Sequence, residues 1–153
     1  MPRIFYTTLA LLLLLSACAS GPTIRYFPPQ ASLKELKQQP DGQWLAQIRV
    51  QNFSTGAMDF SEIRLKIQIQ DGSWAELSGP ASLNIGASNA EVLSLSVPFS
   101  ADTLQAIRER QGKTQPLRYR LEGSLRSRDP NRTYPLTYDG RLNPAPGLSG
   151  VYR

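Results

Sequence analysis

The sequence contains no histidine and a single cysteine, Cys18, among its 153 residues. Without histidine, Ser-His-Asp and Cys-His triads are excluded, and so are histidine-containing zinc sites. One cysteine cannot form a disulfide bond within the chain. The loops at Gly79 and Gly86 carry no phosphate-binding pattern. The composition therefore argues against a hydrolase, a metal protein or a nucleotide-binding enzyme.

The chain has neither a large excess of basic residues nor a large excess of acidic ones. The chain has 17 Lys and Arg residues against 12 Asp and Glu residues, a formal net charge of +5. This balance suits contact with anionic surfaces, but the charges are too scattered to indicate nucleic-acid binding. The length fits one domain, which at this size buries roughly 70% of its unfolded surface.

Long apolar runs are also scarce, and the longest stands at the N-terminus. Residues 4–15 are predominantly apolar and follow a short segment that carries Arg3. As a helix this run would span about 18 Å, less than the ~30 Å hydrocarbon core of a bilayer. The pattern predicts a secretory signal peptide over residues 1–17.

The residues behind this run explain the lone thiol. Leu15-Ser16-Ala17-Cys18 resembles a bacterial lipobox. The resemblance implies cleavage between Ala17 and Cys18, a diacylglycerol on the cysteine sulfur and an acyl chain on its amine. Three chains would anchor the protein stably in a membrane. Ala19, in place of Asp, favours the periplasmic face of the outer membrane. The alternative is an ordinary signal peptide followed by an incidental thiol.

Residues 18–30 form a proline-containing tether that we expect to be extended. At most they span about 40 Å, so the body would be held close to the membrane. Three apolar residues in this segment could dock either on the body or on the lipid interface: Ile24, Tyr26 and Phe27.

From residue 31 the apolar residues alternate with polar ones, which predicts strands. We expect strands over 32–38, 44–50, 63–69, 74–83, 93–97, 117–126 and 134–142, with Trp44 and Trp74 in the core. A short helix is predicted from an N-cap at Ser100 to Arg110. The expected fold of residues 31–143 is all-β, an antiparallel immunoglobulin/fibronectin type III-like β-sandwich of about seven strands with one short helix. Residues 144–153 are predicted to be a flexible tail, of which Val151 and Tyr152 could dock on the body.

The order of these features resembles the late embryogenesis abundant group 2, or WHy-type, domain. The stretches that carry the resemblance are 50–54 (VQNFS), 63–69, 85–88 with 92–99, and the pair 119–125 and 134–140. Phe53 stands where the family often has proline. The resemblance implies a fibronectin type III-like sandwich, an association with desiccation and other stress, and no catalytic residues.

Arginines offer the main candidate contact surface. One face of one strand is predicted to carry four of them and its hairpin partner two, namely Arg118, Arg120, Arg126, Arg128, Arg132 and Arg141. They could meet lipid phosphates or another anionic envelope polymer, although a merely solvated sheet face is the simpler interpretation. Asp59 and Glu62 are the closest carboxyl pair outside turns, and nothing in the sequence requires them to share a cleft.

The sequence thus predicts a lipid-anchored, non-enzymatic envelope protein that works by contact, and the family resemblance implies protection against desiccation or osmotic stress. Two alternatives stay open: an adaptor that recruits an envelope protein partner, and a carrier of lipid or another apolar ligand between the sheets. No metal, nucleic acid or cofactor is expected besides the acyl chains on Cys18.

Overall fold

The computed structural model describes residues 21, 23–77, 79 and 82–153. The predicted signal peptide and Cys18 lie outside the described residues. The elements are β1 (Gln30–Gln38), β2 (Trp44–Gln51), β3 (Met58–Ile69), β4 (Ala75–Leu77), β5 (Leu83–Ile85), β6 (Ala90–Val97), α2 (Ala101–Gly112), β7 (Leu117–Asp129), β8 (Arg132–Leu142) and β9 (Val151–Tyr152).

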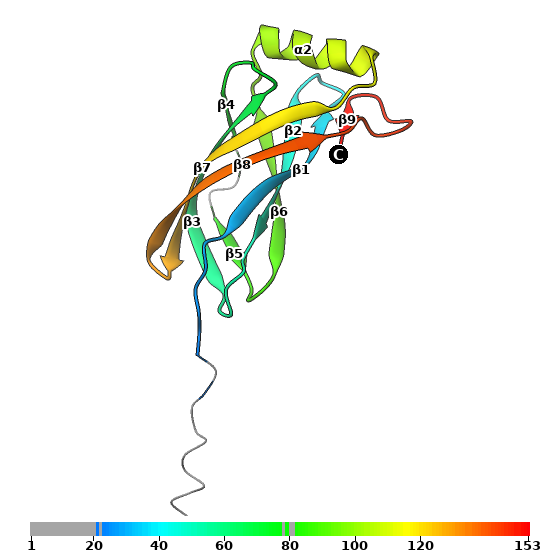
Figure 1. Ribbon diagram of the computed structural model, residues 1–153. Helices are drawn as coiled ribbons and strands as arrows, with labels where there is room; N and C mark the ends of the chain where they lie inside the picture. Colours follow the sequence, from blue (N-terminus) through cyan, green and yellow to red (C-terminus); the bar gives the residue numbers. More distant parts are fainter. Residues whose placement is uncertain (1–20, 22, 78, 80–81) are drawn as a thin grey trace, which may run out of the picture.

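The strands form two antiparallel sheets, as Figure 1 shows. The first sheet has the order β6-β2-β1-β9, and the second has the order β4-β3-β7-β8 with β5 also paired to β3. Helix α2 crosses one end of the molecule, and the N-terminal segment leaves from the opposite end (Figure 1). The all-β prediction with one short helix is confirmed for the described residues.

Alternation along each strand builds a core between the sheets. In β2, Trp44, Ala46, Ile48 and Val50 are all buried, and the residues between them are not. Side chains from the second sheet, among them Ile67 and Leu121, join the same hydrophobic cluster. Each sheet therefore covers the apolar face of the other, which neither could bury alone.

Two close approaches in the second sheet require glycine. At Gly123 in β7 a Cβ atom would lie 1.9 Å from the carbonyl oxygen of Arg64 in β3. At Gly140 in β8 a Cβ atom would lie 2.5 Å from the ring of Tyr119. The first glycine lets two backbones pass closely, and the second gives an aromatic ring its place in the core.

Helix α2 begins where the sequence predicted. The hydroxyl of Ser100 accepts a hydrogen bond from the backbone N–H of Thr103 at 3.3 Å, as an N-cap should. Ile107 is fully buried and attaches the helix to the core. The helix continues to Gly112, two residues beyond the predicted end.

The predicted strand over residues 74–83 is wrong in extent. The structure instead has two three-residue strands, β4 and β5, which pair with different parts of β3. Gly79 and Pro80 stand between them in the sequence, and a proline cannot donate to a strand ladder. Trp74 precedes β4 and is 37% exposed, so its predicted core position is also wrong. Its ring instead lies 4.4 Å from the ammonium group of Lys66.

Residues 144–153, predicted to be a flexible tail, contain a strand. Val151 and Tyr152 form β9 against Lys37 and Leu36 of β1, and Tyr152 is 1% exposed. Arg153 adds an ion pair to Glu35 with an N–O distance of 2.7 Å. The C-terminal segment is fixed because β9 pairs with the free edge of β1 and because the ring of Tyr152 is buried in the core.

Candidate functional site

The arginines lie along the outer surface of the second sheet. Arg118, Arg120, Arg126 and Arg128 alternate with inward-facing residues along β7, and all four are exposed. On β8, Arg141 stands opposite Arg118 in register. Arg132 is also exposed, but it stands opposite the buried residue Ser127. Its position in the alternation therefore belongs to the inward-facing side of the sheet. The predicted row therefore exists, but only five of its six members share one face.

Carboxylates neutralise half of these arginines. Arg120 donates to Asp139 with its Nε at 2.7 Å, and a second bond from Nη2 measures 3.4 Å. The hydrogen bond to Asp139 raises the pKa of Arg120 above its ordinary value. Two further pairs join β7 to β3 and to the turn that follows it: Arg128 with Asp59 of β3 at 3.2 Å, and Arg118 with Asp71 of the turn at 3.6 Å.

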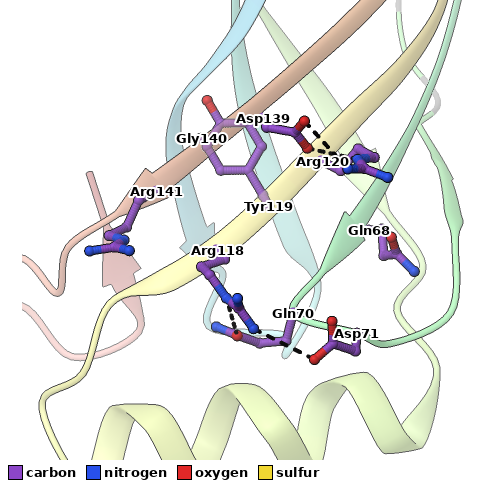
Figure 2. A pocket seen from close by; sticks show the side chains of 9 residues that line it. All are labelled: Gln68, Gln70, Asp71, Arg118, Tyr119, Arg120, Asp139, Gly140 and Arg141. Carbon is purple, nitrogen blue, oxygen red and sulfur yellow. Dashed lines mark hydrogen bonds and ion pairs between the residues drawn. The ribbon is translucent and has the colours of Figure 1, made fainter.

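The remaining arginines are separated. Within the described part of the chain, no ion pair involves Arg126, Arg132 or Arg141. Arg126 and Arg132 flank the β7–β8 hairpin, whereas Arg141 lies near the other end of β8. Figure 2 shows the side chain of Arg141 pointing away from that of Arg118. The structure thus gives a face of alternating charge and no concentrated basic patch.

A shallow open depression of about 470 Å³ lies on this face (Figure 2). Its rim mixes both signs of charge, because Arg118, Arg120 and Arg141 line it together with Asp71 and Asp139. Two glutamines, Gln68 and Gln70, add amide groups. An open surface of mixed charge does not enclose a small ligand in the way that a tight binding pocket does.

The tyrosine beneath this depression has a structural role. The hydroxyl of Tyr119 accepts a hydrogen bond from the backbone N–H of Leu33 at 3.2 Å and donates to its carbonyl oxygen at 3.4 Å. Burial raises the pKa of Tyr119 to about 12. The hydroxyl therefore stays protonated and ties β7 to β1 across the core.

The carboxyl pair noted in the sequence does not converge. Asp59 is bound by Arg128, and Glu62 forms its own ion pair with Arg64. A second open depression, of about 580 Å³, is lined by Glu62 and Arg126 but not by Asp59. The two carboxylates thus face different cations and not one shared cleft.

At the end opposite α2, a buried asparagine organises the loop between β2 and β3. The side-chain nitrogen of Asn52 lies 2.9 Å from the carbonyl oxygen of Gly56, 3.3 Å from that of Ile85 and 3.0 Å from that of Gly86. Its side-chain oxygen accepts from the backbone N–H of Ser54 at 2.8 Å. In the sequence Asn52 stands out only as part of the stretch 50–54 that carries the family resemblance, because a hub of this kind depends on contacts between distant segments.

The N-terminal segment docks on this loop. Arg25 and Thr55 exchange hydrogen bonds: the Arg25 N–H donates to the Thr55 hydroxyl at 2.8 Å, and the Thr55 N–H donates to the Arg25 carbonyl at 3.0 Å. The N–H of Phe27 donates to the hydroxyl of Ser54 at 2.9 Å. The backbone of residues 23–27 therefore lies on the body, so this part of the predicted tether is fixed. Among the described residues, no helix is both long and apolar enough to cross a bilayer.

Comparisons with known proteins add little. No family model and no curated protein matches the chain. Two solved structures are similar in shape. The solution structure of AT1g01470 from Arabidopsis thaliana is 14% identical, with a TM-score of 0.48, over 88% of this chain and 92% of that one. A crystal structure of a protein from Archaeoglobus fulgidus is 11% identical, with a TM-score of 0.41, over 79% of this chain and 98% of that one. No family membership follows from these values.

Proposed function

We propose that the protein is a bacterial envelope lipoprotein, anchored through acyl chains on Cys18 and acting by contact without catalysis. The observation that carries the proposal is the sequence Leu15-Ser16-Ala17-Cys18 directly behind an apolar run. Docking of residues 23–27 on the body supports it, because the fixed body then begins only five residues after the lipidated position. Ala19 favours the periplasmic face of the outer membrane.

The body is proposed to be a sandwich of the fibronectin type III class. In immunoglobulin-like folds, the first, second and fifth core strands share one sheet, and the third, sixth and seventh share the other. Here β1, β2 and β6 lie in one sheet, and β3, β7 and β8 lie in the other, with β4 at its edge. This order also agrees with the fold implied by the resemblance to the late embryogenesis abundant group 2 domain.

The contact role is proposed to be protection of the envelope under desiccation or osmotic stress. Supporting it are that same resemblance and the outer face of the second sheet, where pairs such as Lys66–Glu122 at 3.3 Å alternate charges of both signs. A surface of this kind stays hydrated and discourages sheet-to-sheet aggregation.

An adaptor function is the second candidate, because β6 forms an edge of the first sheet. Val92 on this strand is 42% exposed, and an exposed edge can pair with a strand of a partner protein. Carriage of an apolar ligand is the third candidate, and a hollow of about 300 Å³ beside Trp44, Phe99 and Leu104 is the place for it. This hollow and the two depressions on the second sheet all open at the surface, which disfavours an enclosed ligand.

Replacing the anchor residue tests the proposal. Cys18→Ser should move the protein from the membrane fraction to the soluble fraction or leave it unprocessed, whereas Ser20→Ala, two residues away, should not. A wild-type protein that is already soluble would contradict the anchoring. Survival of a deletion strain after drying and osmotic shock then separates the two contact roles. Unchanged survival together with one stoichiometric crosslinked partner would favour the adaptor.

A further inference from the structure

Four large side chains stand exposed where the N-terminal segment meets the body. Ile24 is 60% exposed, Tyr26 36%, Phe27 45% and Phe53 44%. Ile24 and Tyr26 lie over Gly56, where an added Cβ atom would be 2.7 Å from the Cγ2 atom of Ile24. We call these four side chains the apolar end.

The apolar end is held rigidly. The backbone of residues 25 and 27 is hydrogen-bonded to Thr55 and Ser54, the residues that follow Phe53. The loop is in turn fixed by Asn52, and Ser54 and Asn52 are both fully buried. Three aromatic rings are thus partly exposed on a rigid base, so little conformational freedom is lost when they bind.

The apolar end lies at the end of the molecule opposite α2, where the N-terminal segment leaves the body (Figure 1). Cys18 precedes Thr23 by five residues, so the two residues can be at most about 18 Å apart. An anchor at Cys18 therefore holds this end of the body, and no other, against the bilayer surface.

We propose that the apolar end inserts into the interfacial region of the bilayer and sets the orientation of the body on the membrane. This inference rests on the proposed lipid anchor. Tyrosine and other aromatic side chains favour the zone between headgroups and acyl chains, where an apolar ring and a polar group are both satisfied. The exposed residue Arg25 lies among them and can meet lipid phosphates. The body then stands upright, with α2 directed away from the membrane.

Tryptophan fluorescence offers a direct test on the full mature chain. Phe53→Trp places a reporter in the apolar end, and Leu148→Trp places a matched reporter at a position that is 51% exposed near the opposite end. The native tryptophans serve as background, because both lie toward α2: Trp44 lines a hollow together with Leu104, and Trp74 is two residues from Gly72, which adjoins Thr103. Each protein is bound to vesicles of phosphatidylethanolamine and phosphatidylglycerol, with and without brominated acyl chains that quench tryptophan on contact.

The emission added at position 53 should shift to the blue and fall severalfold with brominated lipid, whereas the emission added at position 148 should not change. Tyr26→Ser with Phe27→Ser should reduce the quenching at position 53, and Val92→Ser, on an exposed position of β6, should not. Unquenched emission at position 53 in a vesicle-bound chain would overturn the inference and would favour a protein partner for this surface. Equal quenching at positions 53 and 148 would overturn it as well, because the body would then have no fixed orientation.

Failure of the anchor is distinguishable from failure of the insertion. Mass spectrometry first shows whether Cys18 is acylated. If it is not, its thiol is the only one in the chain and can be coupled to a maleimide-bearing lipid. The quenching experiment then proceeds with the body tethered at the same residue.

Discussion

At the scale of single residues, Asn52 holds together the end of the body that the chain approaches from its N-terminus. Its side chain joins the β2–β3 loop to the end of β5 by contacting the carbonyl oxygens of Gly56, Ile85 and Gly86. Asn52→Ala would leave several buried backbone groups without partners and should lower the free energy of unfolding by about 3 kcal/mol. Asn84→Ala, at an exposed position, should change it by less than about 0.5 kcal/mol. Urea denaturation measures both, and equal effects would contradict the role of Asn52.

A second residue, Tyr119, makes the stability of the fold depend on pH in the alkaline range. Burial raises its pKa from 10.0 to about 12 in the folded protein. The folded state therefore keeps a proton that the unfolded chain releases, so this contribution to stability is complete below pH 10 and is lost as the pH rises through 12. Between these values, urea denaturation should show a steeper loss of stability for wild type than for Tyr119→Phe. Parallel losses would mean that Tyr119 does not couple folding to pH.

At the scale of elements, the short strand β9 contributes more than its two residues suggest. Tyr152 is 1% exposed and packs beside Leu36 of β1. Tyr152→Ala should lower the free energy of unfolding by about 3–5 kcal/mol, because it empties a large buried volume. Leu148→Ala, four residues earlier in the chain and 51% exposed, should have no measurable effect. A stable Tyr152→Ala protein would show that the C-terminal segment is dispensable.

The arginines of β7 lead to a different expectation. Arg118 and Arg120 each face a carboxylate, so anionic lipid would have to compete with Asp71 and Asp139. Replacing both arginines with glutamine should leave the binding of an unacylated chain that begins at Cys18 to anionic vesicles unchanged in sedimentation. Arg25→Gln, within the apolar end, should weaken that binding about fivefold. If only the replacement of Arg118 and Arg120 weakened vesicle binding, the arginine face would be the contact surface.

Elements differ in how far the sequence predicted them. The strand β2 and the cap at Ser100 follow from local patterns, and the structure has them where the period and the capping residue place them. The strand predicted over 63–69 is also present, but β3 begins five residues earlier, at Met58. The division into β4 and β5 and the docking of β9 depend on which edge of a distant strand is available. The hub at Asn52 and the partners of the arginines depend likewise on contacts between distant segments, which no local pattern reports.

At the scale of the whole molecule, the two ends of the body differ in character. One end carries α2 and the C-terminal segment, and the other carries the apolar end and the exit toward Cys18 (Figure 1). Two sheets with one shared core form a stable module between them. In the proposed arrangement, anchor and apolar end act at the same end, so the charged outer face of the second sheet stands roughly perpendicular to the membrane and is open to the periplasm.

Mass spectrometry of the N-terminal peptide, taken from the membrane fraction of cells that make the native protein, tests the central claim most directly. We expect a chain that begins at Cys18 and carries a diacylglycerol on its sulfur and an acyl group on its amine. A chain that retains residues 1–17, or one with an unmodified Cys18, would contradict it.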